Sequence, residues 1–565
     1  MNSPILNILE DMKLKLLRSI VILILVSVLF IFLSLCLTYC ETPLEEDAFI
    51  TFRYVENFLN GNGFVFNKSE RVEGISNFLW AVVLAILSRF GFALLPTSAM
   101  LGLGLGILII WTLWLFSVLY LKSESYFQFI APLLLSTHTS FIISCTNGLE
   151  TALYTFFITI GTISFVLELR EKEVFPYSAV IFSLASMTRP EAPLLFSGIM
   201  LTLIFRDLIN HKLRRHTVVS SVTFCLIYGS FISFRIYYYH DIFPNTIYSK
   251  ITASTLRSSI LLFDFFVNTK SYFILFPALF LLFKTYAKKP FYQIVIIITV
   301  HTISLLFTTP FPRYIVPILP LSFILVQEGL FQISRILEHF SSVKGRYKEG
   351  FVLLLTVSIL LTNLLGHDFG FWGKFVVPKA NLLLINLKQI FANPTIIKRK
   401  FEAYNWQNTP QNFHALFGDW IRRNIPENSI ILYDQMGQTP FYAGRSYTFI
   451  DSLGITDKII AEIKYKEKNF ILFKIRDLVL KLVPGVDAET YQKDLTFSGY
   501  VLSRNPDYIF ILVKSKEIRR LIFLDEFNHR YYKYRNFIPG SREFNAYYRK
   551  TSVPIPKFIL SYPLH

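Results

Sequence analysis

Long runs of apolar residues, separated by short polar segments, occupy the first two thirds of the 565-residue chain. A helix needs about 20 apolar residues to cross the hydrocarbon core of a bilayer. We therefore expect about eleven spans, near 17–37, 75–92, 96–121, 127–144, 150–168, 176–205, 217–239, 271–283, 291–308, 311–330 and 350–366. The first run is too long for a secretory signal, and no small-residue cleavage site follows it. The pattern predicts a polytopic α-helical membrane protein.

The last third of the chain is more polar and mixes two periodicities. Residues 413–423 have the pattern of an amphipathic helix, which Pro426 would end. Short apolar runs at 429–433, 447–450 and 508–513 are typical of buried strands. Strands separated by helical stretches predict a small α/β domain.

These changes of pattern divide the chain into four regions. We expect a cytoplasmic tail and first transmembrane helix at 1–37, an extracytoplasmic loop with an amphipathic helix at 38–74, a transmembrane bundle at 75–366 and an extracytoplasmic α/β domain at 367–565. The orientation follows from Lys13, Lys15 and Arg18, because basic residues beside a span remain on the cytoplasmic side.

Three later basic segments support this orientation. Alternation from the first span places 206–216, 284–289 and 335–348 on the cytoplasmic side. Lys122 and Arg170 fall on the opposite side. We therefore expect the region 75–176 to be miscounted or to contain half-helices.

Charge and cysteine content exclude two classes of function. The 56 lysines and arginines exceed the 39 acidic residues by 17, but much of the excess lies in short loops, so nucleic acid is not the expected partner. All four cysteines precede the polar last third. That region therefore has no disulfide framework and no thiolate metal site.

Acidic residues gather just after the first span, in Glu45-Glu46-Asp47. Carboxylates at the edge of a membrane span are typical of a base or an ion ligand. Residues 48–59 are amphipathic and are expected to lie along the bilayer surface. Glu73 and Asn77 stand where the second expected span begins, so we expect them to form a polar pocket with Asp47.

These motifs resemble the GT-C superfamily of membrane glycosyltransferases, and within it the bacterial arabinofuranosyltransferase-like branch. The resemblance is carried by the segments at 46–54, 60–67, 70–80, 148–152, 189–191, 241–250 and 313–317, and by 434–437, 442–445 and 451–457 in the last third. The family commonly begins the first motif with two aspartates, whereas this chain has Glu46 before Asp47. Asp47 is therefore the better candidate for the base.

The resemblance implies an inverting glycosyltransferase of the bacterial inner membrane. It would move a sugar from a polyprenyl-phosphate donor to a glycan, glycolipid or protein acceptor on the outer face. Asp47, with Glu46 beside it, would take the proton of the acceptor hydroxyl. The expected donor phosphate ligands are Arg53, Lys250 and Arg313, and the expected substrate-binding residues are Glu73, Asn77, Asn245, Arg189 and Glu191.

Several alternatives stay open at this stage. Arg53 is as well explained by snorkelling or by pairing with Glu56, and Arg189 with Glu191 by an ion pair within the bundle. Glu150 fits either a structural or a functional role. A divalent cation at Glu46 and Asp47 is not favoured, and no cofactor is expected. Rival functions are a flippase or transporter of lipid-linked sugars, and a scaffold that binds envelope glycan without catalysis.

Overall fold

The structure is a computed structural model. It describes residues 4–38, 44–123, 125–169, 175–250, 259, 289–307, 312–340, 350, 353–354, 356–357, 413–466, 470–480, 496–511, 516–537 and 544–550. The expected span at 271–283 and most of that at 350–366 lie outside the described residues.

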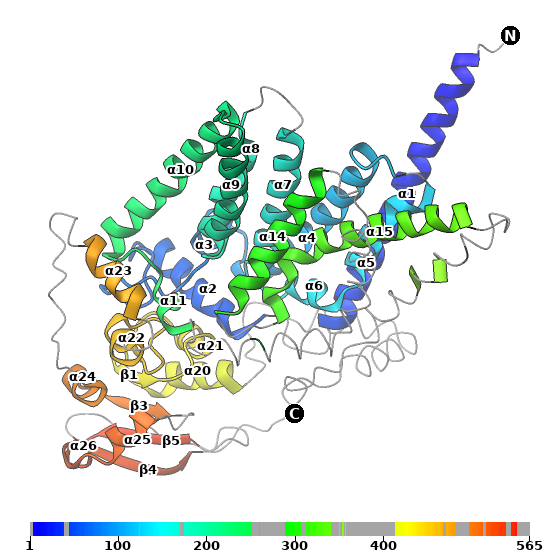
Figure 1. The fold of residues 1–565 in the computed structure, drawn as a ribbon. Helices are drawn as coiled ribbons and strands as arrows, with labels where there is room; N and C mark the ends of the chain where they lie inside the picture. The colour runs from blue at the N-terminus through cyan, green and yellow to red at the C-terminus, as the bar shows by residue number, and fades with distance from the viewer. Residues whose placement is uncertain are drawn as a thin grey trace, which may run out of the picture.

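Helices form the larger part of the molecule (Figure 1). In chain order the first part contains α1 (Pro4–Thr38), α2 (Glu46–Leu59), α3 (Phe78–Arg89), α4 (Leu94–Leu119), η1 (Ser125–Phe129), α5 (Ile130–Ser136), α6 (Thr139–Ser144), α7 (Thr151–Glu168), α8 (Tyr177–Thr188), α9 (Ala192–Ile209), α10 (Arg215–Tyr239), α11 (Asn245–Lys250), α14 (Lys289–Leu305), η2 (Pro312–Tyr314), η3 (Val316–Ile318) and α15 (Leu319–Phe340). Within the described residues, six helices are long and apolar enough to cross a membrane: Lys13–Leu37, Leu94–Leu119, Thr151–Glu168, Ala192–Ile209, Arg215–Tyr239 and Val316–Ile336. The expected fold class, a multi-pass helical membrane protein, is confirmed.

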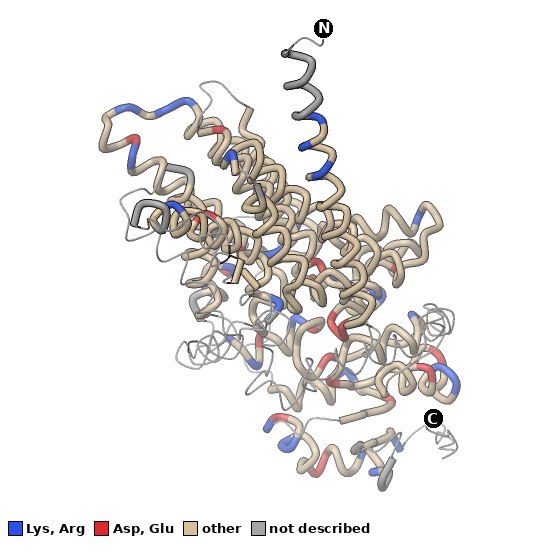
Figure 2. Tube along the Cα trace, turned by 90° about the vertical axis from the view of Figure 1, so that its right-hand side faces the viewer, with Lys and Arg blue, Asp and Glu red and all other residues tan. Residues whose placement is uncertain are grey.

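The helix ends of the bundle gather at two opposite ends. Glu168, at the end of α7, accepts a hydrogen bond from the Ser178 amide of α8 at 2.7 Å and lies 3.1 Å from His216 Nε2 of α10. The N-terminus lies at this end as well, and Figure 2 shows lysines and arginines there with few acidic residues, whereas both kinds are mixed at the opposite end. We call it the basic end. Glu150 before α7 and Arg189 after α8 are bonded to each other at the other end, which we call the site end.

Two of the expected spans differ from the structure. One was counted as a crossing that is not made, and the other as one helix where there are two, so these two errors leave the number of crossings unchanged. The run 75–92 forms only α3, a helix of 12 residues that begins at the site end, where Asn77 donates to Glu150. The next helix, α4, also starts at the site end, because a Cβ at Gly148 would meet Ser98 Oγ at 3.2 Å. The run 176–205 is two helices, α8 and α9, interrupted at 189–191.

With these corrections the basic segments among the described residues lie at one end of the bundle. α4 runs antiparallel to α1, since Gly106 lies against Phe30 and the later Trp111 donates to the earlier Ser27 at 3.1 Å, so Lys122 follows α4 at the basic end. The link between α7 and α8 also begins and ends there. The run 127–144 is divided between η1, α5 and α6, which fits the half-helices expected for this region.

The last third contains a five-stranded sheet in the order β2-β1-β3-β5-β4. Strand β1 (Ile430–Tyr433) pairs in parallel with β2 (Thr448–Asp451) and β3 (Tyr508–Ile511), as the apolar runs predicted. The antiparallel strands β4 (Tyr531–Phe537) and β5 (Phe544–Arg549) complete it. The accompanying helices are α20 (Phe413–Asn424), α21 (Gln438–Ala443), α22 (Lys458–Tyr465), α23 (Phe470–Leu480), α24 (Phe497–Arg504), α25 (Lys516–Ile522) and α26 (Asp525–Arg530).

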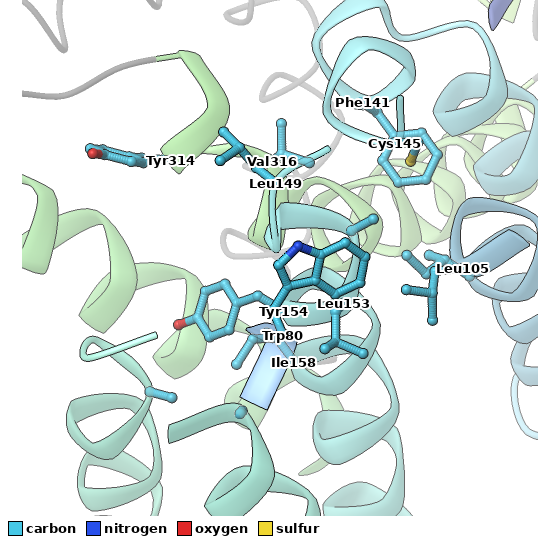
Figure 3. Packing of buried hydrophobic residues seen from close by; sticks show 14 of the residues in the cluster. Trp80, Leu105, Phe141, Cys145, Leu149, Leu153, Tyr154, Ile158, Tyr314 and Val316 are labelled. Atoms are coloured by element: carbon cyan, nitrogen blue, oxygen red, sulfur yellow. The ribbon is translucent and has the colours of Figure 1, made fainter. Parts of the chain in front are cut away.

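Helix α2 lies between the bundle and the sheet region. Phe49 of α2 packs edge-on against Phe441 of α21 at 5.3 Å between ring centroids. One continuous apolar cluster runs from Trp80 and its neighbours in the bundle (Figure 3) through α2 to Phe449 of β2. The loop after α2 joins the sheet as well, because Asn67 exchanges hydrogen bonds of 2.8 and 3.0 Å with the Phe449 backbone.

A buried arginine fastens this arrangement. Arg53 of α2 is 1% exposed, and its guanidinium donates to the carbonyl oxygens of Pro440, Gly444 (2.9 Å) and Tyr447 (2.9 Å) and, across the loop, Phe66 (3.0 Å). Desolvation lowers its pKa to about 10, which leaves it charged at neutral pH. Hydrogen bonds from a charged donor are each worth about 1.5–3 kcal/mol.

We expect Arg53→Ala to loosen the contact between α2 and residues 440–447. The substitution leaves buried carbonyls without a donor, at a cost of about 3 kcal/mol or more. The purified variant should have a Tm several degrees below that of wild type and be cleaved faster by protease in the last third. Arg71→Ala is the matched control, because Arg71 is exposed and only stacks on Tyr238 at 5.0 Å. Equal Tm values for the two variants would contradict the prediction.

Candidate functional site

Two carboxylates at the start of α2 share one arginine. Asp47 accepts a hydrogen bond from Arg313 Nη2 at 2.7 Å, and Glu45 lies 3.0 Å from Arg313 Nη1. The acids are in or beside the first turn of α2, where the helix dipole favours negative charge. Their side chains remain 38% and 44% exposed, whereas that of Arg313 is 12% exposed. The acids therefore face solvent in front of a largely enclosed cation.

Behind this pair a tyrosine ring separates two arginines. The guanidinium carbons of Arg313 and Arg189 lie 5.5 and 4.6 Å from the centroid of the Tyr314 ring. Arg189 binds Glu191 through two nitrogens, at 3.1 and 2.8 Å, and Glu150 through the third, at 2.8 Å. The break between α8 and α9 thus places a charged group next to the Asp47 pair.

The contacts continue until they return to α2. Glu150 accepts a hydrogen bond from Asn77 at 2.8 Å, and Asn77 lies 3.1 Å from the hydroxyl of Thr51. Thr51 is one helical turn after Asp47. A closed series of polar contacts therefore joins α2, η2, the α8–α9 break, the start of α7 and the start of α3.

Glu46 points in a different direction from Asp47. Its carboxylate accepts a hydrogen bond from the Gln438 amide at 2.9 Å. Burial raises the pKa of Glu46 to about 7. The Asp47 charge acts in the same direction, and the hydrogen bonds from the Gln438 and Gly437 amides oppose it. A Cβ at Gly437 would stand 2.1 Å from the Glu46 carbonyl oxygen, so no side chain fits there. Glu46 joins α2 to the last third of the chain rather than to Arg313.

Three predicted site residues have other contacts. Arg53 is engaged by backbone carbonyls, which corrects its expected role as a phosphate ligand and also excludes snorkelling. Glu73 forms a buried ion pair with Arg235 at 2.6 Å, so its carboxylate is engaged by another residue. Asn245 donates to the carbonyl oxygens of Gly454 and Ile455 at 2.9 and 3.0 Å. Lys250 ends α11, and its side chain lies outside the described residues.

The structure brings together Asp47, Arg313, Arg189, Glu191 and Asn77 from the predicted set. It adds residues that the sequence left unassigned or undecided: Glu45, Glu150, Tyr314, Gly437 and Gln438. Glu45 and Tyr314 are direct neighbours of predicted residues, which is the one signal that could have found them. In the part of the chain that the structure describes, no group of three or more His, Cys, Asp or Glu side chains could hold a metal ion.

Comparisons with known proteins give three results. The family described as a domain of unknown function, DUF8728, matches residues 402–554. No curated protein matches. Among solved structures, ArnT from Cupriavidus metallidurans bound to undecaprenyl phosphate has 12% identity and a TM-score of 0.48 over 78% of this chain and 88% of that one.

The arabinofuranosyltransferase AftD from Mycobacteria has 11% identity and a TM-score of 0.46 over 94% of this chain and 40% of that one. At this level of similarity, the case for function comes from the residues of the site.

Glu46 should make stability depend on pH. Because its pKa is about 7 in the folded protein and 4.5 is the ordinary value, the folded state binds more protons between these limits. Its stabilising contribution is therefore complete below about pH 4.5 and is lost as the pH rises through 7.

We expect Glu46→Gln to raise Tm relative to wild type at pH 8, with the difference vanishing near pH 4.5. The amide oxygen of glutamine can still accept from Gln438, but it carries no charge to desolvate. Thermal unfolding of both proteins across this range measures the effect. The matched control is Glu70→Gln, because the Glu70 carboxylate of the wild type is paired with Arg504. A difference in Tm between wild type and Glu46→Gln that is independent of pH would contradict the assignment.

Proposed function

We propose that the chain is an inverting glycosyltransferase of the bacterial inner membrane. It transfers a sugar from a polyprenyl-phosphate donor to a glycan, glycolipid or protein acceptor on the outer face. The observation that carries the proposal is the contact of Asp47 with Arg313 at the site end of the bundle. It combines a solvent-facing carboxylate, as the base, with an adjacent cation that can bind phosphate.

Asp47 supplies the base. An acceptor hydroxyl is a weak nucleophile until a positioned carboxylate removes its proton. The acceptor oxygen then forms a bond to the anomeric carbon while the bond from that carbon to the phosphate oxygen breaks. The proton goes to Asp47 and the electron pair leaves with the polyprenyl phosphate. Attack opposite the leaving group inverts the anomeric centre through an oxocarbenium-like transition state.

Arg313 stabilises the leaving phosphate. A guanidinium has five N–H donors in a fixed fork, enough for one arginine to bind carboxylates and a phosphate oxygen together. Donor phosphate competes with the exposed Glu45 for this cation, so binding of the donor displaces the weaker partner and leaves Asp47 in place. Lys250 is a second cation proposed for the phosphate.

The charge distribution supports the orientation. Cytoplasmic loops of membrane proteins are rich in lysine and arginine. The N-terminus is thus assigned to the cytoplasm with the rest of the basic end, and the site end to the outer face. In this arrangement 38–74 is the catalytic loop, 75–366 is the bundle, and 367–565 is the extracytoplasmic domain. The broken α8–α9 helix is the one feature that favours a transporter of lipid-linked sugar instead.

We expect Asp47→Asn to lower the transfer rate by about 100-fold or more, because an amide cannot take the proton. Folding and donor binding should be retained, since the amide still accepts from Arg313. Glu45→Gln is the matched control, because it alters the other acid on Arg313 and should keep transfer within about 10-fold of wild type.

The measurement is mass spectrometry of envelope glycans and polyprenyl-phosphate sugars in deletion cells that carry each variant. Loss of one sugar, restored by wild type and by Glu45→Gln but not by Asp47→Asn, agrees with the proposal. Full restoration by Asp47→Asn would instead favour a transporter or a scaffold.

Arg313→Ala should weaken donor binding and slow phosphate departure. Removing one preorganised donor at such a site costs about 100- to 1000-fold in rate. Lys250→Ala should act in the same direction. Arg335→Ala in α15, where Arg335 stacks on Phe331 at 5.9 Å, serves as the control. Binding of undecaprenyl phosphate to the purified proteins measures the effect, and unchanged affinity in Arg313→Ala would remove this residue from the site.

A further inference from the structure

Two buried polar atoms near Arg189 are not hydrogen-bonded. Among the described residues, neither the Tyr154 hydroxyl nor Nδ1 of His301 has a partner, although the side chains belong to residues that are 0% and 2% exposed. Thr151 Oγ1, one residue after Glu150, is in the same situation. Buried polar groups nearly always have partners, because desolvation without a hydrogen bond is unfavourable. These atoms therefore have unused hydrogen-bonding capacity for a further polar group.

The atoms lie beside the charged group described above. His301 Nε2 is 2.7 Å from the Tyr314 carbonyl oxygen, and the rings of His301 and Tyr154 are 6.4 Å apart. Figure 3 shows the Tyr154 hydroxyl pointing away from Trp80 and Leu153. The side chains of Arg189 and Glu191 keep 12% and 13% of their surface exposed, so the group reaches the surface.

The donors and acceptors match a hydroxyl. Because Nε2–H of His301 donates to a carbonyl, Nδ1 of the neutral ring is an acceptor. The Tyr154 hydroxyl can donate or accept, and Glu150 and Glu191 accept. A sugar carries several hydroxyls, and each of them can donate and accept at the same time. A phosphate offers only acceptors to these carboxylates.

The local charge adds a second restriction. Glu150 and Glu191 face one cation, Arg189, so the group has one excess negative charge when the imidazole is neutral. A uronic acid would bring a further carboxylate next to it. Arg189 and Arg313 both contact the Tyr314 ring, so a donor with its phosphate at Arg313 has its sugar within reach of Arg189.

We propose that Tyr154 and His301, together with Glu150, Arg189 and Glu191, bind the transferred sugar through its hydroxyls, and that this site takes an uncharged or amino sugar and rejects a uronic acid. The inference rests on the proposed function. A purely structural reading is that a water molecule bridges Tyr154 and His301.

The variant Tyr154→Phe distinguishes the sugar-binding site from a site that only holds a bridging water molecule. The substitution deletes one hydroxyl without changing the packed ring, and it removes a buried polar atom, so Tm should stay equal or rise. Ser220→Ala is the matched control. Ser220 Oγ is likewise buried and without a partner among the described residues, but it lies in α10 near the basic end.

The experiment measures binding of four lipids to the full-length protein in nanodiscs. They are undecaprenyl phosphate alone and the same lipid carrying arabinofuranose, glucose or glucuronate. We expect at least one neutral-sugar lipid to bind wild type more tightly than the bare lipid. Tyr154→Phe should lower the affinity for that sugar lipid by about 3- to 10-fold and leave the affinity for the bare lipid unchanged. Ser220→Ala should change neither, and glucuronate should add no affinity.

Three results overturn the inference: no sugar lipid binding wild type more tightly than the bare lipid, the same sugar-dependent gain in wild type and Tyr154→Phe, or glucuronate binding as tightly as the neutral sugars. The last two leave the proposed function standing. Two other results would contradict the proposed function and this site with it. They are failure of the bare lipid to bind wild type, and binding of the bare lipid to Arg313→Ala with the same affinity as to wild type.

Discussion

The buried guanidinium of Arg53 determines where the site can be. It holds backbone carbonyls from three positions between Pro440 and Tyr447 while its own helix carries Asp47 less than two turns away. Because carbonyl oxygens belong to the main chain, the contact fixes the position and rotation of α2 against the last third of the chain. The direction of the Asp47 side chain is set by that rotation. A buried charge is unfavourable without partners, and here several dipoles supply them.

The second determinant is the closed series of contacts from Asp47 through Arg313, Tyr314, Arg189, Glu150 and Asn77 back to Thr51. Each member restricts its neighbours, so the side chains near Asp47 have little freedom to rearrange. Such a site is preorganised, and a preorganised group acts on a developing charge without first having to turn toward it. The same contacts also explain how charged residues are accommodated at the end of an apolar bundle.

The sequence predicted those parts of the molecule that depend on local pattern. Strands β1, β2 and β3 follow from short apolar runs, and Asp47 stood out as an acid directly after a span. The bounds of the expected spans were wrong where composition alone does not determine length, as in the run that forms α3. The contacts of Arg53 and Glu73 could not be predicted because their partners, the carbonyls of 440–447 and Arg235, are far away in sequence. Asp47 and Arg313 were both assigned to the site from the sequence, but the direct contact between these residues, 266 positions apart, was not predicted.

The close approach of Gly437 to Glu46 has a consequence for how such proteins can be recombined. Where a Cβ would stand 2.1 Å from the opposite backbone, the two surfaces meet main chain to main chain. The matched segment at 402–554 is therefore not an appendage that could be exchanged by itself. A chimera that takes the last third from a relative would have to take the loop after the first span as well, because the two surfaces form a single interface.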